Sequence, residues 1–401
     1  MMNDKTLSGA EWIQLGKQYL METYNRFHVV PVKGEGMTIY DCDGKAYLDF
    51  LGGIAVCGLG HSHPEVVAAI REQASLLTHV SNLYHIPLQV EVARLLVENS
   101  FAQKVFFCNS GAEANEGAIK LARKYGHEQL GGRDEIITME NSFHGRTLAT
   151  ITATGQKKIQ KGFEPLPKGF VYVPFSDIKS LREAITDRTC AVMLEPIQAE
   201  GGVIVPYPGY LKDVRNLCDE KNILMILDEV QVGMGRTGKL FAHEYENITP
   251  DMMTLAKALG NGFPVGALLA TEKIAASFVP GSHASTFGGN PLGMSAAKAT
   301  LHVLLGDGFT DHVMQLGLYM KQRLEELRQN NKCIKDVRGC GLILGMEMDM
   351  EVRDIINRCI EEGFLVGSAG THVLRFLPPL VVEKGHVDQL VGTLDYILGD
   401  I

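Results

Sequence analysis

The chain has 401 residues, of which 45% are hydrophobic and 21% charged, and its formal net charge at pH 7 is −9. This balance is typical of a globular protein of two or three domains and excludes a disordered or fibrous chain. The negative charge argues against a nucleic acid or an anionic membrane as partner, because both normally bind a basic face. A small anionic substrate needs only a local basic pocket and is not excluded.

The first 55 residues show weak periodicity, and we expect this N-terminal segment to pack with a small C-terminal domain. From residue 56 to 305, helical patterns alternate with short apolar runs. The expected strands of this large domain are residues 105–108, 135–139, 191–194, 223–227 and 266–270. Because these strands are apolar throughout, we expect an α/β fold with a mainly parallel sheet covered by helices.

Residues 306–401 change in character. A long helical pattern from Val313 to Leu327 is followed by an apolar run at 341–348. Two more helical patterns then flank the run at 372–378. We interpret this part as a smaller α+β domain.

The eight cysteines lack the two-residue spacing of redox and zinc motifs, and several lie in apolar runs, as Cys108 and Cys190 do. We expect reduced core thiols in a cytoplasmic protein. The N-terminus has no basic region followed by an apolar run, and no apolar stretch reaches membrane-spanning length, so we expect neither a signal peptide nor a membrane segment.

Polar side chains follow the expected strands at the points where they end. Asn109, Ser110 and Gly111 follow one strand, Glu195 another, and Asp228 and Glu229 a third, while Lys257 precedes the run at 266–270. In an open parallel sheet, ligands bind outside the carboxyl ends of the strands. We therefore expect a ligand site where these residues meet.

Each residue of this set also has a plainer interpretation. The spacing of Ser110 and Glu113 is that of a capping box, which either only starts a helix or offers free backbone N–H groups to a phosphate. Asp228 either ends a strand in a turn or holds a cationic partner such as a protonated pyridine nitrogen. Lys257 is either a snorkelling side chain or a nucleophile whose pKa is lowered by apolar surroundings.

Two other motifs suggest different functions. The stretch GMGRTGK, residues 233–239, spells GxGxxG, but Leu240 replaces the Ser or Thr of a P-loop, and no clear helix follows. We prefer an ordinary glycine-rich loop, with a nucleotide-dependent oxidoreductase as a remote alternative. His61 and His63 lack further ligands at sensible spacing, so we expect no metal and predict a loop before a proline-started helix.

Taken together, the stretches NSGAEANEGAIKLARK, NSFHGRT, LEPIQAEGGV, LDEVQVGMGRTG, TLAKALGNGFPVGA and STFGGNPL resemble the class III (omega) aminotransferases. The resemblance covers nearly the whole chain and implies the PLP-dependent transferase fold of type I, with pyridoxal 5'-phosphate (PLP) as cofactor. It also implies a homodimer with shared active sites.

The resemblance implies a role for each cofactor contact. Lys257 would bond covalently to the cofactor and shuttle a proton, and Asp228 would keep the ring nitrogen protonated. The other implied contacts are Ser110, Gly111 and Ala112 at the phosphate, Thr286 at the phosphate of the neighbouring subunit, Phe143 and Val230 on the two faces of the ring, Gln231 at the phenolic oxygen, and Glu195 behind the ring.

The implied reaction moves the terminal amine of N-acetylornithine to 2-oxoglutarate by a ping-pong mechanism, giving glutamate in arginine biosynthesis. Arg375 would grip the carboxylate beside the reacting carbon of glutamate, and Glu200 would cover Arg375 when that carboxylate is absent. Arg146 would bind the distal carboxylate. Phe27 aligns with a tyrosine of the ornithine enzymes, and the loss of its hydroxyl favours an acylated substrate.

Two further departures bear on the substrate. Ala199 stands where a glycine is usual before Glu200, and Cys57 stands where polar residues are common. Ornithine, succinylornithine or 4-aminobutyrate as amine donor therefore remains an alternative. A racemase on the same scaffold and a non-catalytic binding module are further alternatives, and consumption of 2-oxoglutarate would separate both from an aminotransferase.

Overall fold

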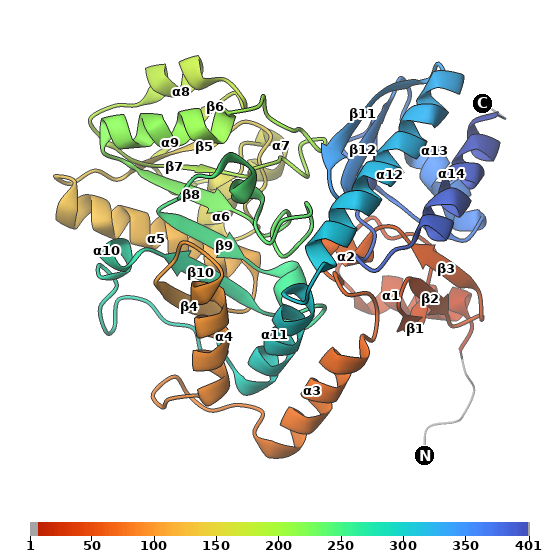
Figure 1. Ribbon diagram of the computed structural model, residues 1–401, viewed down its shortest axis with the longest axis horizontal. Coiled ribbons are helices and arrows are strands. Elements are labelled where there is room, and N and C mark those ends of the chain that lie inside the picture. The colour runs from red at the N-terminus through yellow and green to blue at the C-terminus, as the bar shows by residue number, and fades with distance from the viewer. Residues whose placement is uncertain (1–6, 400–401) are drawn as a thin grey trace.

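The computed structural model describes residues 7–399, which form three sheets and the helices around them (Figure 1). The largest sheet has the strand order β4-β10-β9-β8-β7-β5-β6. Its strands are β4 (Lys104–Cys108), β5 (Glu135–Met139), β6 (Phe170–Val173), β7 (Thr189–Leu194), β8 (Leu224–Asp228), β9 (Met252–Leu255) and β10 (Gly266–Ala270). Only β10 runs antiparallel to its neighbours, so the expected α/β fold with a mainly parallel sheet is confirmed.

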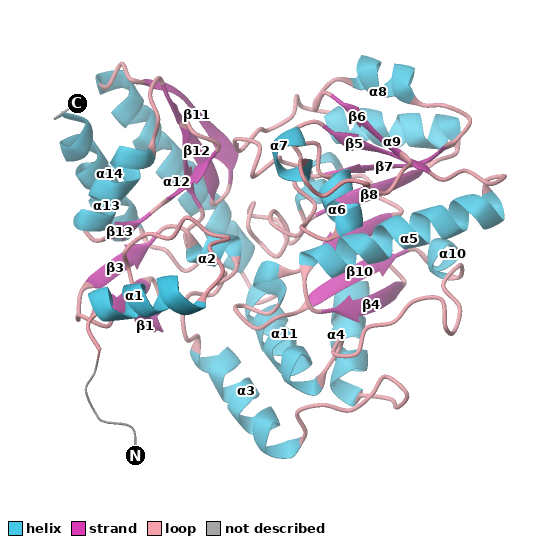
Figure 2. Ribbon diagram, turned by 180° about the vertical axis from the view of Figure 1, so that it is seen from behind, coloured by secondary structure: helices cyan, strands magenta, loops and turns pink. Residues whose placement is uncertain are grey.

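Helices cover both faces of this sheet, which explains why its strands are apolar throughout. Ile226 of β8 packs in a buried cluster with α5 (Gly111–Gln129), whereas the next residue, Leu227, packs with α9 (Tyr210–Lys221). Successive side chains of a strand point to opposite faces, so a sheet covered twice needs apolar residues at every position. Figure 1 shows α8 (Ile178–Ala184) and α9 on one face, and Figure 2 shows α5 on the other.

The C-terminal part of the chain forms a second, antiparallel sheet of order β11-β12-β15-β14. Its strands are β11 (Ile334–Cys340), β12 (Ile343–Met348), β14 (Gly367–Ala369) and β15 (Val373–Phe376). The helices α12 (Phe309–Asn330), α13 (Arg353–Glu361) and α14 (Lys384–Gly399) accompany this sheet (Figure 1). An α+β arrangement is thus present where the sequence predicted one.

The third sheet joins the two ends of the chain. Strands β1 (Pro31–Glu35), β2 (Thr38–Asp41) and β3 (Ala46–Asp49) pair in order, and β3 then pairs in parallel with β13 (Phe364–Leu365). The N-terminal strands therefore lie beside the C-terminal helices in both views (Figures 1 and 2). The division into domains at residues 55 and 305 stays a prediction.

The remaining helices connect these sheets. They are α1 (Gly9–Tyr19), α2 (Gly52–Ala55), α3 (Pro64–Leu76), α4 (Pro87–Glu98), α6 (Leu148–Ala153), α7 (Lys157–Gln160), α10 (Glu272–Ala275), α11 (Pro291–Leu304) and the 3₁₀ turns η1 (Ala242–Glu246) and η2 (Lys257–Leu259). All eight cysteines are free, and four of them are buried. Within residues 7–399, no helix has the length and apolarity that crossing a bilayer requires.

Candidate active site

A cavity of about 430 Å³ lies at the carboxyl ends of β4, β7, β8 and β9. Among the residues that the sequence singled out, those lining it are Ser110, Gly111, Ala112, Phe143, Arg146, Glu195, Asp228, Val230, Gln231 and Lys257. These residues come from stretches of chain up to about 150 residues apart, and the sheet brings them together because β4, β7, β8 and β9 run in the same direction and end at one edge. The predicted ligand site therefore exists as a cavity.

Lys257 follows β9 directly, after a single intervening alanine. Strand β9 was not among the strands predicted from the sequence, where this lysine was placed only before the run at 266–270; β9 carries Lys257 to the same edge as Asp228. Lys257 has a φ of +45°, an uncommon conformation for a residue other than glycine, which is found mostly where the surrounding structure fixes it. Burial lowers the pKa of its amine from 10.5 to about 8, although Glu200 acts in the opposite direction.

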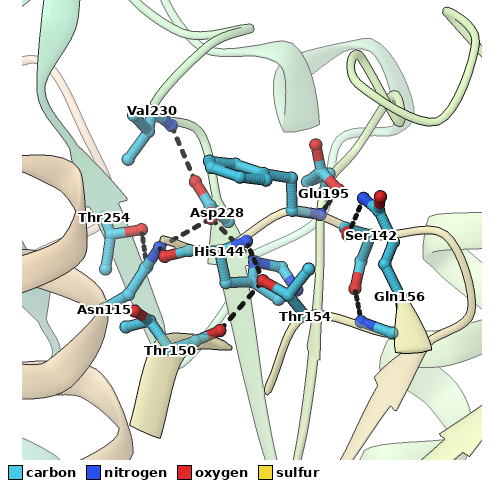
Figure 3. Close-up of polar contacts among 12 residues, drawn as sticks. Asn115, Ser142, His144, Thr150, Thr154, Gln156, Glu195, Asp228, Val230 and Thr254 are labelled. Carbon is cyan, nitrogen blue, oxygen red and sulfur yellow. Dashed lines mark hydrogen bonds and ion pairs between the residues drawn. The ribbon is translucent and has the colours of Figure 1, made fainter. Parts of the chain in front are cut away.

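Asp228 ends β8, and its buried carboxylate accepts three hydrogen bonds (Figure 3). The side-chain amide of Asn115 donates to Oδ2 at 2.7 Å, and Nδ1 of His144 lies 2.8 Å from the same oxygen. The backbone N–H of Val230 donates to Oδ1 at 3.0 Å. The carboxylate is thus held in one orientation, at the wall of the cavity.

A second layer of buried polar groups, which was not predicted from the sequence, orients these donors. The Thr254 hydroxyl donates to the side-chain oxygen of Asn115 at 2.7 Å, which leaves the amide nitrogen of Asn115 for Asp228 and for the backbone oxygen of His144 (Figure 3). The backbone N–H of His144 donates to the Thr154 hydroxyl at 2.8 Å. Asn115 and His144 are 113 and 84 residues from Asp228, so no spacing in the sequence could reveal the network.

Glu195 follows β7, and its buried side chain accepts the backbone N–H of Phe143 at 3.0 Å. Burial raises the pKa of this carboxyl well above its usual value, and the nearby charge of Asp228 adds to the effect. The hydrogen bond fixes the backbone of Phe143, whose ring lies at the cavity wall. Glu195 thus supports Phe143, the residue that the family resemblance assigns to one face of the cofactor ring.

The N-terminus of α5 forms another part of the wall. Ser110 caps the helix by accepting the N–H of Glu113 at 3.2 Å, as predicted, whereas the Glu113 carboxylate reaches past the cap to the N–H of Asn109. The first amides of a helix have no intrahelical acceptor and favour an anion. A Cβ atom on Gly111 would lie 2.7 Å from a methyl group of Val230, so the small residue keeps this corner open.

Arg375 of β15 and Glu200 form an ion pair next to the cavity. The guanidinium Nη1 of Arg375 lies 2.5 Å from Glu200 Oε1 and also donates to the side-chain oxygen of Gln231 at 3.2 Å. Gln231 in turn donates to Glu200 at 3.3 Å. Although burial alone would raise the pKa of the Glu200 carboxyl, Arg375 holds it below its usual value. Gln231 therefore contacts both members of the ion pair.

Arg146 is the arginine that lines the cavity itself. It is exposed, and its guanidinium carbon lies 5.5 Å from the centre of the Phe143 ring, on which it packs. Arg146 lies in the segment between β5 and α6, whereas Arg375 lies in β15 of the second sheet. A substrate with two carboxylates has a cation available for each.

Two predicted residues lie outside this arrangement in the single chain. Phe27 lines a separate cavity formed by residues 12–31, and the guanidinium carbon of Arg353 lies 4.5 Å from its ring centre. Thr286 is exposed and does not line the cavity that contains Lys257. A role for Thr286 at a neighbouring subunit, and for Phe27 at the substrate, stays a prediction.

The motifs that were set aside behave as ordinary structure. Residues 233–239 form consecutive turns, and Arg236 is buried and donates from Nη1 to the backbone oxygens of Leu342 and Pro378. The neighbouring Glu229 accepts hydrogen bonds from the backbone of Ala242 and His243. His61 pairs with Asp49 at 2.8 Å, and Pro64 starts α3 as predicted. The glycine-rich loop of residues 233–239 therefore packs inside the fold and does not open a helix toward a nucleotide.

The residues present fit PLP. A mostly buried amine with a lowered pKa, a buried carboxylate held in one orientation and a helix N-terminus surround one cavity. These groups match an aldehyde, a pyridinium nitrogen and a phosphate. Gly111 leaves the space beside Val230 that an added Cβ would fill.

Comparisons with known proteins agree with this geometry. The class-III aminotransferase family matches residues 19–398. The chain is 52% identical over 396 residues to the acetylornithine aminotransferase of Methanocaldococcus jannaschii, covering 98% of this chain and 100% of that one. The ornithine aminotransferase structure from Toxoplasma gondii superposes with a TM-score of 0.95 at 32% identity, covering 99% and 97% of the two chains. The N-acetylornithine aminotransferase structure from Stenotrophomonas maltophilia superposes with a TM-score of 0.83 at 38% identity, covering 97% and 98%.

The fold and the site define a PLP-dependent transferase of fold type I. The chain belongs to the class-III aminotransferases. Its cofactor is therefore pyridoxal 5'-phosphate, which another structure of the Toxoplasma ornithine aminotransferase holds in its active site. The nucleotide-dependent oxidoreductase and the racemase are thereby set aside as classes.

Proposed function

We propose that this chain is an acetylornithine aminotransferase, which moves the terminal amine of N-acetylornithine to 2-oxoglutarate and yields N-acetylglutamate semialdehyde and glutamate. The observation that carries the proposal is the Glu200–Arg375 pair beside the Lys257 cavity. The relatives of similar length from Methanocaldococcus jannaschii and Caldanaerobacter subterraneus bear this name. Ornithine, succinylornithine and 4-aminobutyrate are the alternative donors.

Lys257 and Asp228 are the proposed catalytic residues. When bound, the cofactor supplies an aldehyde that takes up the amine and a protonated ring that accepts electrons from the substrate carbon. Lys257 Nζ is the group that would bond to that aldehyde. Once freed by the incoming amine, Lys257 Nζ would take the proton from the carbon bearing the reacting nitrogen and deliver it to the cofactor's former aldehyde carbon within the same half-reaction. The second half-reaction would reverse this proton transfer. A pKa of about 8 keeps a useful fraction of this amine unprotonated near neutral pH.

Asp228 would face the ring nitrogen and keep it protonated. Its hydrogen bonds from Asn115 and His144 hold the carboxylate in place, so it need not reorganise during the reaction. The remaining proposed cofactor contacts are Ser110, Gly111 and Ala112 at the phosphate, Phe143 and Val230 on the ring faces, Gln231 at the phenolic oxygen and Glu195 behind Phe143. Gln231 would have to turn away from the Glu200–Arg375 pair to reach the phenolic oxygen.

The two half-reactions require different states of Arg375. Glutamate and 2-oxoglutarate carry a carboxylate beside the reacting carbon, and Arg375 would bind it while Glu200 moves aside. The terminal amine of acetylornithine has no such carboxylate, so Glu200 stays paired with Arg375 and neutralises it. Arg146 would bind the far carboxylate of either substrate.

A homodimer is also part of the proposal. Large apolar side chains are exposed on residues 76–90 and 279–287, among them Leu76, Leu83 and Phe287, which are 70%, 86% and 58% exposed. The side-chain amide of Asn82 binds the backbone oxygens of Ser285 and Gly288, so the two segments lie together. An apolar surface of this kind marks an interface. A second copy covering it would bring Thr286 toward its partner's cofactor. We place the enzyme in the cytoplasm.

The test is spectral titration of the PLP-loaded protein with each donor, followed by addition of 2-oxoglutarate. The proposal expects a clear preference for N-acetylornithine over ornithine, succinylornithine and 4-aminobutyrate. A higher kcat/KM with unacylated ornithine or 4-aminobutyrate would assign a different substrate within the same class. A non-catalytic module would show no turnover with any donor.

A further inference from the structure

Glu200 sits in a short loop that is closed at its base. Gln198 and Ile204 exchange backbone hydrogen bonds of 3.0 and 2.9 Å, so residues 199–203 form the loop between them. The side-chain amide of Gln198 anchors this base to the backbone oxygen of Glu140 at 2.9 Å. The position of the Glu200 backbone therefore depends on what the five loop residues contact.

The loop rests on one line of residues across the C-terminal sheet. Arg338 of β11 pairs in register with Gly345 of β12, and Gly345 pairs with Arg375 of β15. Side chains at directly paired positions lie on the same face of a sheet. The two arginines therefore stand on either side of a glycine and face the loop together.

Val203 fills the space above that glycine. It is fully buried and has a φ of +54°, a costly conformation for a β-branched residue, which indicates that its surroundings hold it there. A Cβ atom on Gly345 would lie only 3.0 Å from the Val203 Cβ. The glycine thus makes room for the loop between the two arginines.

Each arginine contacts a different part of the loop. Arg375 pairs with the Glu200 side chain, whereas Arg338 donates from Nε to the backbone oxygen of Gly202 at 2.9 Å. The Arg338 guanidinium is itself held by Asp336 at 3.0 Å and by Glu347 at 2.5 Å. A guanidinium fixed on one side by two carboxylates presents its remaining donor in a fixed direction.

We propose that Arg338 is a positioning residue for the Glu200 switch: it holds the loop backbone still, so that only the Glu200 side chain moves when a carboxylate arrives at Arg375. This inference rests on the proposed function, because it assigns Arg338 to the residue pair that separates the two half-reactions. Arg338 does not line the cavity and is not a catalytic residue.

The alternative is a merely structural ion pair. Asp336 and Glu347 are both more than 40% exposed, and pairs with exposed carboxylates contribute little to stability. A structural role predicts that loss of Arg338 lowers both half-reactions equally. A positioning role predicts that loss of Arg338 changes kcat/KM for acetylornithine relative to kcat/KM for glutamate. Without Arg338, Glu200 covers Arg375 less reliably, which weakens the reaction with acetylornithine and favours a carboxylate at Arg375.

The experiment compares Arg338→Met, Arg338→Lys and the control Arg328→Met in the PLP-loaded protein. Arg328 also pairs with a carboxylate, that of Glu325, and donates to a backbone oxygen, that of Lys335, but it does not contact the loop. Methionine retains the aliphatic stem and removes the donor. Single-turnover kinetics give kcat/KM for acetylornithine and for glutamate, and hydrogen exchange is followed on a peptide that spans residues 198–204.

For Arg338→Met we expect the ratio of the acetylornithine to the glutamate kcat/KM to fall about fivefold, with faster exchange of the loop amides. Arg338→Lys keeps a charged donor and should restore much of the ratio. Arg328→Met should change neither. An equal loss in both half-reactions with unchanged exchange overturns the proposal, as does a full effect in Arg338→Lys equal to that of Arg338→Met.

The two proposals can fail separately. If the wild-type protein does not act on acetylornithine, the proposed function fails, and the exchange measurement alone decides whether Arg338 holds the loop. If Arg338→Met does not fold, Arg338→Gln replaces it in both measurements, because glutamine retains a polar stem that cannot span to Gly202 and the carboxylates together.

Discussion

Glu200 and Arg375 form an ion pair of 2.5 Å, but the two side chains differ in burial. The side chain of Arg375 is 4% exposed, whereas that of Glu200 is 28% exposed. The arginine is enclosed by its sheet, by Gln231 and by the backbone oxygen of Ala199. In the proposed switch, we therefore expect Glu200 to be the member that moves away and Arg375 the member that stays to receive a carboxylate.

Glu200→Gln should change the preference between substrates. The amide can still accept a hydrogen bond from Arg375 but no longer neutralises its charge, so a substrate carboxylate competes more easily. We expect kcat/KM for acetylornithine to fall about tenfold and that for glutamate to hold or rise, measured in separate half-reactions. Glu220→Gln, which removes an exposed pair with Arg182, is the control and should alter neither. A parallel fall for both substrates would contradict the switch.

His144→Gln should slow catalysis without removing the catalytic carboxylate. The imidazole Nδ1 is 2.8 Å from Asp228, and its loss lets the carboxylate turn away from the cofactor. Losing a partner that orients a functional group typically costs about 10–100-fold, and we expect kcat to fall within this range. Asp228→Asn should cost considerably more, because it removes the charge itself. The idea fails if His144→Gln has wild-type kcat while Asp228→Asn is inactive.

The pKa of Lys257 predicts how fast the apoprotein captures its cofactor at different pH. Burial lowers the pKa of the amine to about 8, and only the unprotonated amine attacks the aldehyde. The capture rate should therefore rise about tenfold per pH unit below pH 8 and level off above it. Stopped-flow absorbance of apoprotein mixed with PLP measures this rate. A rate that keeps rising past pH 10, as for an exposed lysine, would show that burial does not tune this amine.

Gly111→Ala should weaken cofactor binding. The new methyl group would lie 2.7 Å from Val230 Cγ1, so Val230 would have to shift from the wall of the cavity. Overpacking of this kind costs about 1–3 kcal/mol, which corresponds to a rise of about 5- to 150-fold in the Kd for PLP. Gly392→Ala is the control, since nothing lies within 4 Å of its added Cβ in α14. Equal PLP affinity in both variants, by equilibrium dialysis, would contradict the close packing.

Much of the large sheet could be read from the sequence because helices cover both of its faces. That double burial makes the strands continuously apolar, and the runs at 135–139 and 266–270 coincide with β5 and β10. The strand predicted at 223–227 begins and ends one residue before β8. Strands β6 and β9 were both missed. For β9 the reason is that MMTLA has no turn signal to separate it from the stretch that contains Lys257.

The groups behind the site could not be predicted in the same way. Asn115 lies in the second turn of α5 and reads as an ordinary helical residue, although its side chain joins Thr254 to Asp228. Arg338 lies before the predicted strand at 341–348 and was assigned no role, and only the pairing of β11, β12 and β15 sets it beside the loop of Glu200. Such contacts depend on which residues of separate strands pair with each other, and this pairing produces no periodic pattern in the sequence.

The sequence by itself determined the class of fold and the family, and it singled out Lys257 and Asp228 as the proposed catalytic pair, because apolar strands and the polar residues after them are local patterns. The tertiary structure alone decided which donors hold Asp228, how far burial lowers the pKa of Lys257, and which two arginines grip the Glu200 loop. These properties arise from distances between segments that are far apart in the chain, and only folding sets those distances.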